Sequence, residues 1–445
     1  MKIVALALII SIVFLTYGLQ TVLGIASGST GIYSSDIVTN VGIVQKGFWY
    51  DPDWNTIETS DNVYDWNDFD NVINNAPTGK KIRIKIKGGR AAPTWLIGAD
   101  SSSGTTCDQN SPAGIHKFFV EPSNVAPYCA PYVWQDAYRD KLIEFMQDLG
   151  THISGLANKS AIAGVQTFGG TNYSEMITPG GNTSYGQSIL YPEAYTQASY
   201  IAALEAEVLA LASTLPPDIP IIINLSQTWK DNSFTPDSQV AKTVGDWALS
   251  QYGGRIELQN ASVPKTFPDL VNYFKSKNPS TVAISMQIGW NKLTQAPPDV
   301  FEGEGENEVT YNELCNAYAS AYAMGARTIE VNKDALNQTG PLTPINQDLV
   351  AATTKWANFL SGVGPFPYDC LGNQPAPPTP TITNSACPLH TNGDASCDSR
   401  IDTDDFNIWR DEFLGILSTK TSDFNNDNTI NTDDFNIWRD GFLGL

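Results

Sequence analysis

Alternation of strand-like and helix-like segments is the feature that most restricts the fold of this chain. Short stretches rich in Ile and Val, bounded by Gly, Asn or Pro, are typical of strands. Amphipathic stretches separate them, as in residues 138–149, where Leu142 and Leu149 share one helical face. This repetition predicts a parallel sheet joined by crossover helices. The expected strands are residues 41–50, 81–87, 161–168, 219–225, 255–259, 281–288 and 327–331.

Closing such a sheet into a (β/α)8 TIM barrel requires one more strand, for which the weak stretch Gly31 to Tyr33 is the candidate. We therefore predict an α/β domain, a (β/α)8 TIM barrel, over residues 27–370. A doubly wound open sheet is the alternative, but no Gly-x-Gly-x-x-Gly follows the first strand.

The N-terminus carries a cation, a long apolar run over residues 3–14 and then small residues. This pattern predicts a signal peptide over residues 1–26 and a secreted or cell-surface protein. Because the run is long for a signal, a retained membrane anchor is the alternative. The six cysteines form no Cys-x-x-Cys pair, so they indicate disulfides rather than a zinc or redox site. The pairs closest in sequence are Cys107–Cys129 and Cys387–Cys397, although spacing alone does not fix the pairing.

The formal charge of −21 argues against a nucleic-acid partner. The three histidines lie in no His-Glu-x-x-His motif, and no Gly-x-Ser-x-Gly occurs. Metalloprotease and Ser-His-Asp chemistry therefore lack their usual parts. Carboxylates must carry any hydrolysis.

A Pro- and Thr-rich stretch without charge, residues 371–386, predicts a semi-rigid linker. The module behind it, residues 387–445, is a duplication. Its copies begin 29 residues apart, at Asp394 and Asp423, and share TDDFNIWRD followed by FLG. Each copy places oxygen-bearing residues at positions 1, 3, 5, 7, 9 and 12 before an aromatic helix, as a calcium loop does. The predicted ligands of two Ca²⁺ are Asp394, Ser396, Asp398, the Arg400 carbonyl, Asp402 and Asp405, then Asp423, Asn425, Asp427, the Thr429 carbonyl, Asn431 and Asp434.

Two such loops, each followed by one helix, resemble a type I dockerin, a small all-α calcium-binding module. The resemblance implies a cohesin-like protein as partner, bound through one helix and loop positions 10 and 11. Position 6 is usually Gly in that family, whereas Ser399 and Asn428 occupy it here. Asn tolerates a left-handed backbone better than Ser, so the first site is the weaker match. The residues at positions 10 and 11 are Thr403, Asp404, Thr432 and Asp433.

An aromatic pattern early in the barrel runs from Trp49 through W-x-x-x-E and Y-D-W to GKKIRIKIKGG and PTWL. It resembles the beta-galactosidase-like (β/α)8 glycoside hydrolases. That resemblance implies an O-glycosidic bond in a polysaccharide or oligosaccharide as substrate. The abundance of Trp and Tyr agrees, because aromatic faces stack on sugar rings. The expected substrate-binding residues are Trp49, Glu58, Trp95, Asn172, Gln287 and Trp290.

Glycoside hydrolysis needs two carboxyl groups, and barrel active sites lie at the C-terminal strand ends. Glu175, which follows the strand expected over residues 161–168 through a Gly-Gly-Thr-Asn turn, is the acid/base candidate. The resemblance implies an acid/base Glu after the fourth strand, often directly behind an Asn, whereas Asn172 precedes Glu175 by three residues. The family's nucleophile lies on the seventh strand, but residues 281–288 contain no acid. Glu330 on the eighth strand is therefore the first candidate for the nucleophile of a retaining mechanism, and Glu257 is the second. A buried ion pair with a residue such as Lys333 is the structural alternative for Glu330. The alternatives for the whole chain are a non-catalytic carbohydrate-binding protein and a cell-surface assembly protein.

Overall fold

The structure is a computed structural model. The chain divides into two compact units, residues 1–364 and 365–445, and each is treated by itself. The expected signal segment and the expected linker fall outside the described part of the chain. Among the described residues, no helix has the length and apolar character needed to cross a membrane. The described residues are 30–35, 45–98, 102–103, 106–107, 111–120, 128–167, 172–173, 195–230, 236–263, 268–279, 281–288, 311–331, 344–364, 366–367, 393–395, 401, 403–413 and 420–443.

Eight parallel strands close into a barrel in the order β1-β18-β17-β16-β13-β11-β5-β2. The barrel confirms the predicted fold, and the open sheet is wrong. The weak stretch at Gly31 does supply the missing strand, which pairs with both β2 and β18. The strands are β1 (Gly31–Ser34), β2 (Gly47–Tyr50), β5 (Lys81–Ile84), β11 (Ile162–Gln166), β13 (Ile221–Asn224), β16 (Ile256–Val263), β17 (Ala283–Ile288) and β18 (Thr328–Val331).

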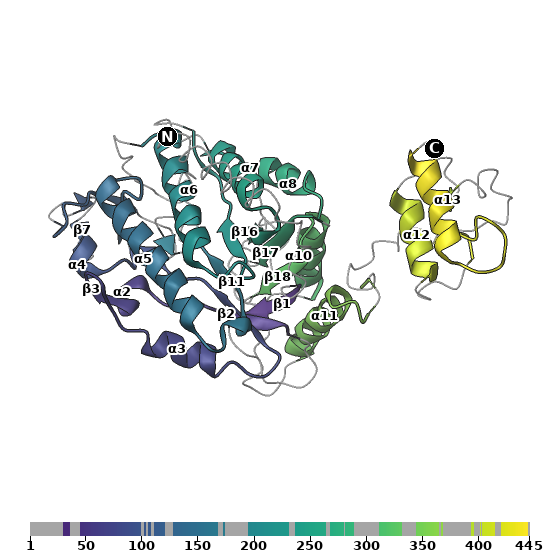
Figure 1. The fold of residues 1–445 in the computed structure, drawn as a ribbon, viewed down its shortest axis with the longest axis horizontal. Helices are drawn as coiled ribbons and strands as arrows, with labels where there is room; N and C mark the ends of the chain where they lie inside the picture. The colour runs from purple at the N-terminus through teal and green to yellow at the C-terminus, as the bar shows by residue number, and fades with distance from the viewer. Residues whose placement is uncertain are drawn as a thin grey trace, which may run out of the picture. The chain divides into compact units, whose positions relative to one another are not determined.

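Helices surround the barrel (Figure 1). The apolar face predicted for residues 138–149 is the buried face of α5, with Leu142 and Leu149 both inside. Ile82 and Ile84 of β5 are likewise fully buried. The helices are α2 (Trp54–Ile57), α3 (Asn67–Asn74), α4 (Thr94–Ile97), α5 (Asp136–Gly155), α6 (Gln197–Thr214), α7 (Gln239–Tyr252), α8 (Pro268–Lys275), α10 (Tyr311–Ala323) and α11 (Pro344–Leu360), with 3-10 turns η1 (Lys159–Ala161) and η3 (Gly253–Arg255).

Short two-stranded sheets lie in the connections between the barrel elements. One of them joins β9 and β10, and the predicted Cys107–Cys129 disulfide ties β8 to β10. Cys315 is also disulfide-bonded. Cys387 and Cys397 lie outside the described residues. The additional strands are β3 (Glu58–Ser60), β4 (Val63–Tyr64), β6 (Gly88–Gly89), β7 (Ser102–Ser103), β8 (Thr106–Cys107), β9 (Lys117–Val120), β10 (Tyr128–Pro131), β12 (Asn172–Tyr173), β14 (Thr228–Trp229) and β15 (Pro236–Asp237).

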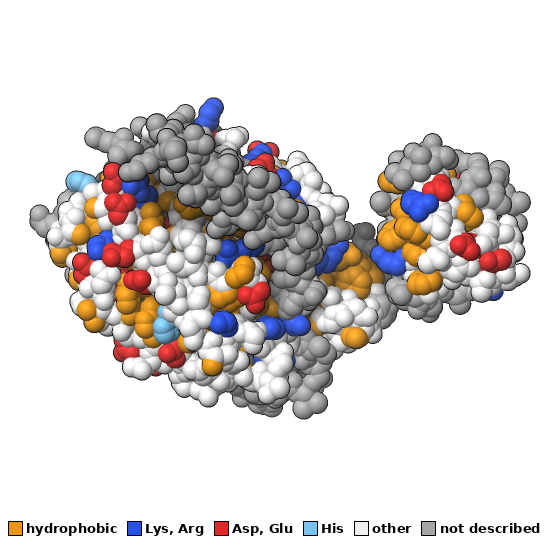
Figure 2. All heavy atoms as spheres, viewed as in Figure 1, with side chains coloured by type: hydrophobic (Ala, Val, Ile, Leu, Met, Phe, Trp, Pro, Cys, Tyr) orange, Lys and Arg blue, Asp and Glu red, His pale blue; other side chains and the backbone are white. Residues whose placement is uncertain are grey.

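The second unit contains one helix from each repeat, α12 (Thr403–Phe413) and α13 (Thr432–Leu443). The repeats pack through reciprocal aromatic contacts. The rings of Phe406 and Trp438 lie 5.0 Å apart, and those of Trp409 and Phe435 also lie 5.0 Å apart. Two equivalent phenylalanines, Phe413 and Phe442, remain 47% exposed at the helix ends. Apolar side chains are visible on this unit in Figure 2.

Candidate active site

Charged side chains occupy the interior of the barrel. Side chains alternate between the two faces of a strand, so the three isoleucines of IRIKIK face one way and its cations the other. Arg83 is fully buried and extends across the barrel. Its Nη2 donates to Glu257 at 2.7 Å and to Ser285 at 3.1 Å, and its Nε donates to Glu330 at 2.6 Å. One guanidinium on β5 therefore links the two carboxylates considered as nucleophiles.

Lys85 supplies the second cation of this interior. Its ammonium pairs with the other oxygen of Glu330 and donates to Gln287 Oε1 at 3.2 Å. We call Arg83, Lys85, Glu257 and Glu330 the Arg83 network. It contains two cations and two carboxylates, so its formal charges cancel. All four side chains are nearly or fully buried.

Glu330 is held in its ionised form. Burial alone would raise the pKa of this carboxyl, but the Lys85 ammonium and the Arg83 guanidinium outweigh burial and lower the pKa below its usual value. The structural alternative considered for Glu330 thus holds in part. The carboxylate does lie in buried ion pairs, with Arg83 of β5 and with Lys85 directly after that strand, while Lys333 is outside the described residues.

Aromatic rings border the Arg83 network. The Arg83 guanidinium lies 5.4 Å from the centroid of the Tyr33 ring, and the Lys85 ammonium lies 5.0 Å from that of Trp49. Both distances are typical of cation–π contacts. Burial, the largest influence, raises the pKa of the Tyr33 hydroxyl. The predicted substrate-binding residues Trp49 and Gln287 therefore both contact Lys85, the cation that pairs with the candidate nucleophile Glu330.

Several polar groups of this interior make no hydrogen bond to the described residues or to each other. β13 and β16 each contribute one whole amide, from Asn224 and from Gln259. These two are register partners, and within the described ranges neither the oxygen nor the nitrogen of either amide has a hydrogen-bond partner. Gln259 also pairs in register with Ser285, whose hydroxyl binds Arg83, so both amides share the inward face. Among the described residues, Tyr33 Oη, Arg83 Nη1 and Glu257 Oε2 also have no hydrogen-bond partner.

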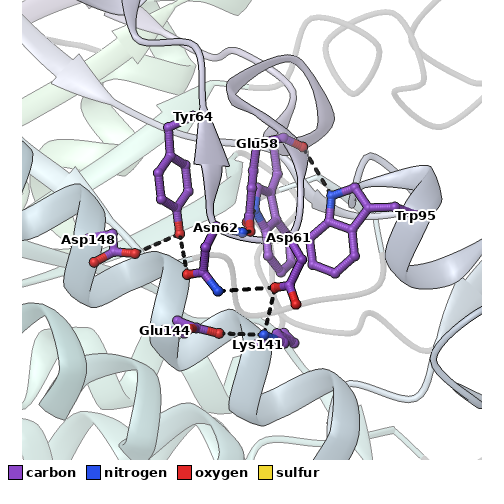
Figure 3. A network of polar contacts seen from close by, with 9 residues as sticks. Glu58, Asp61, Asn62, Tyr64, Trp95, Lys141, Glu144 and Asp148 are labelled. Carbon is purple, nitrogen blue, oxygen red and sulfur yellow. Dashed lines mark hydrogen bonds and ion pairs between the residues drawn. The ribbon is translucent and has the colours of Figure 1, made fainter.

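Glu58 and Trp95 lie together in a different network (Figure 3). The Glu58 carboxylate accepts hydrogen bonds from Trp54 Nε1 at 2.8 Å and from the Asn62 amide at 3.0 Å. The Glu58 carbonyl accepts from Trp95 Nε1 at 3.2 Å. Asn62 adopts a left-handed φ of 58° in the β3–β4 turn, so Glu58 stabilises an unusual backbone conformation. Burial raises the pKa of Glu58 despite these hydrogen bonds. Substrate binding by Glu58 and Trp95 stays a prediction.

The remaining barrel predictions are only partly located. Asn172 lies in β12, where its backbone pairs with that of Gly89. Glu175 and Trp290 lie outside the described residues. Sequence reasoning did not identify Arg83, Lys85 or the inward amides. The alternating cations of IRIKIK could have indicated Arg83 and Lys85 as interior residues. A strand of a closed barrel is covered on both faces, so the cations on one of its faces must point into the barrel.

The second predicted calcium loop is described in full. Asn428 at position 6 has φ 66°, the left-handed conformation expected there. Asp423 Oδ2 accepts a hydrogen bond from the Asn428 amide at 2.8 Å. Asp434, fully buried at the start of α13, accepts from the amides of Phe424 and Asn431 at 2.8 and 2.9 Å. These bonds draw the chain into a turn around its acidic side chains.

The chemistry of the donors suits calcium, which binds carboxylate and carbonyl oxygens. In this structure, however, the exposed Asp427 carboxylate accepts from Thr429 and Asn425. Among the described residues, no three His, Cys, Asp or Glu side chains converge closely enough to hold a metal ion. Of the first loop, Asp394 and Asp405 are buried. Ser396, Asp398, Arg400 and Asp402 lie outside the described part of the chain.

Comparison with known proteins gives distant structural likenesses. The chain matches no model of a protein family and no curated protein. A solved structure of the catalytic domain of beta-amylase from Paenibacillus polymyxa is 12% identical with a TM-score of 0.42, covering 74% of this chain and 97% of that one. Endo-glycoceramidase II from Rhodococcus sp. is 13% identical with a TM-score of 0.38, covering 71% of each chain. Xylanase B from Clostridium stercorarium F9 is 11% identical with a TM-score of 0.38, covering 69% of this chain and 87% of that one. Likeness at this level concerns the barrel fold alone.

Proposed function

We propose that the barrel is a glycoside hydrolase that cleaves O-glycosidic bonds in a polysaccharide or oligosaccharide. The observation that carries the proposal is Glu330, a buried carboxylate on the last barrel strand that two cations keep ionised. Glu330 lies next to the last residue of β18, and therefore near the C-terminal end of the barrel where such enzymes have their active sites. An ionised carboxylate is one of the two groups that glycoside hydrolysis requires.

Glu330 would act as the nucleophile and Glu175 as the acid/base. The Glu330 oxygen forms a bond to the anomeric carbon as the bond to the leaving oxygen breaks, and Glu175 donates its proton to that oxygen. Water then attacks the glycosyl ester, Glu175 takes the water's proton, and Glu330 is released. The outcome is retention of configuration. Glu257 is the alternative nucleophile, because it shares Arg83 with Glu330 and keeps one oxygen unpartnered among the described residues.

A non-catalytic carbohydrate-binding barrel is the second candidate. Both oxygens of Glu330 lie in ion pairs, and a carboxylate bound in this way has a structural role available to it. In this case the interior would bind sugar without cleaving it.

We further propose that the C-terminal unit is a calcium-dependent docking module and that the protein is exported. The left-handed Asn428 and the oxygen-rich loop support calcium, which would neutralise carboxylates that otherwise repel each other. The helix of one copy and the residues at loop positions 10 and 11 would bind a cohesin-like protein. The disulfide between Cys107 and Cys129 supports an oxidising compartment.

The hydrolase proposal is tested by screening the full-length protein against nitrophenyl glycosides and plant and microbial polysaccharides. Proton NMR of the first product anomer assigns retention or inversion. We expect turnover with retention, and we expect Glu175→Gln to remove most of it without changing the melting temperature. Sugar binding without turnover would favour the second candidate.

A further inference from the structure

We propose that Asn224 and Gln259 form a hydroxyl-binding wall for a neutral sugar unit at the C-terminal end of the barrel. The choice of a sugar as ligand rests on the proposed function. The two residues are register partners on β13 and β16, with exposed fractions of 2% and 0%. Among the described residues, neither the oxygen nor the nitrogen of either amide has a hydrogen-bond partner.

Unpartnered amides of this kind need an explanation. A buried amide without a partner destabilises a fold, and native proteins leave few such groups. Here two occur side by side on one inward face, and the Glu257 Oε2 oxygen and the Tyr33 hydroxyl in the same interior also lack a partner in the part of the chain that the structure describes. Groups that the fold leaves unsatisfied in one place are available to a ligand.

The wall lies beside the candidate nucleophile. Gln259 is two residues beyond Glu257 on β16, so it occupies the same face one step nearer the C-terminal end. Ser285, its register partner on β17, binds the guanidinium that also binds Glu330 at 2.6 Å. β13 ends at Asn224, and the C-terminal ends of the strands are where barrel enzymes meet their substrates.

The chemistry of the wall selects a neutral ligand with several hydroxyls. Each amide offers hydrogen-bond donors and an acceptor, and a sugar hydroxyl can both donate and accept a hydrogen bond. The cations nearby are already matched, because Arg83 and Lys85 pair with Glu257 and Glu330. The Arg83 network, as far as the described residues show, therefore leaves no surplus positive charge for the carboxylate of a uronic acid. Buried water is the other occupant that could satisfy the amides.

Apolar substitutions of nearly the same size distinguish a sugar from buried water as the occupant of the wall. We would make Asn224→Leu and Gln259→Met in the full-length protein. Asn260→Leu is the matched control, because the Asn260 amide is equally buried but donates to the Leu225 carbonyl at 2.7 Å. Melting temperature and calorimetric Kd are measured with cello-, xylo-, manno- and laminari-tetraose and with tetragalacturonate. A Glu175→Gln background serves where the wild type cleaves the sugar.

We expect one neutral tetraose to bind the wild type. Each wall variant should bind it about tenfold more weakly, as for loss of a hydrogen bond, with an unchanged or slightly higher melting temperature. The control should melt lower and bind normally. The wall is refuted if its variants melt as low as the control and keep full affinity, which would identify buried water as the occupant. It is also refuted if no tetraose binds, or if tetragalacturonate binds best. Gln259-dependent binding in a protein without turnover would contradict the hydrolase proposal and leave the wall intact.

Discussion

Replacing Arg83 by Met should destabilise the barrel strongly and in a pH-dependent way. Among the described residues, Arg83 is the only cation paired with Glu257, whose side chain is 1% exposed, whereas Glu330 keeps Lys85. Removing one partner of a buried ion pair costs about 3–5 kcal/mol, because the other charge is left buried. With an unfolding entropy of about 2.1 cal/mol/K per residue over a unit of residues 1–364, this loss lowers the melting temperature by about 4–7 °C.

The effect should shrink as the pH falls. The pKa of Glu330 is lowered in the fold, so its ion pairs stabilise the protein above the ordinary carboxyl pKa of about 4.3, and that stabilisation is lost as the pH falls through the lower folded value. The melting difference between wild type and Arg83→Met should therefore be larger at pH 7 than at pH 4.

Differential scanning calorimetry at both pH values measures this difference. The double variant Arg83→Met/Glu257→Gln is the control, because it removes the stranded charge and should recover part of the lost stability. A melting temperature within about 1 °C of wild type at pH 7 would refute the reasoning, since the predicted shift is several times larger. So would a double variant no more stable than the single one.

Three further predictions concern other parts of the chain. Glu58→Gln should lower the free energy of unfolding, measured with urea, by about 1–3 kcal/mol, because it weakens the hydrogen bonds from Trp54 and Asn62. A loss of sugar affinity at unchanged stability would instead assign Glu58 to the substrate site. The double variant Cys107→Ser/Cys129→Ser should lose about 3 kcal/mol in the same assay, because the disulfide closes a loop of 22 residues, and a loss under about 1 kcal/mol would contradict that role. Residues 387–445 alone should show little helix by circular dichroism in chelator and become helical in millimolar calcium. Asp423→Ala should reduce this calcium-induced helicity more than Asp394→Ala. Equal helicity in both conditions, without calcium uptake by calorimetry, would exclude a calcium module.

The barrel could be predicted because its strands carry a local pattern. Apolar, β-branched runs marked seven of them, and closure required an eighth at the weak stretch that is β1. Strand ends were less predictable. Within the described part of the run predicted over residues 41–50, the strand begins at Gly47, and β16 extends beyond Gln259 to Val263.

The candidate site was harder to predict because its contacts join distant segments. Glu330 was identified from its own strand, but its partners Arg83 and Lys85 lie on a strand more than 240 residues earlier. A neighbour in sequence, Lys333, was the natural partner to consider. The amides of Asn224 and Gln259 belong to no sequence motif. They become notable only because register places them side by side and because neither has a hydrogen-bond partner among the described residues.

The central claim is that Glu330 is the nucleophile of a carboxylate-pair hydrolase. Trapping the glycosyl–enzyme ester tests it most directly. The 2-deoxy-2-fluoro derivative of the best glycoside from the screen is incubated with the protein, and the labelled residue is located by peptide mass spectrometry. We predict stoichiometric labelling at Glu330 in the wild type and none in Glu330→Gln. Labelling at Glu257 or another carboxylate, or the absence of any glycoside that is turned over, would contradict the claim.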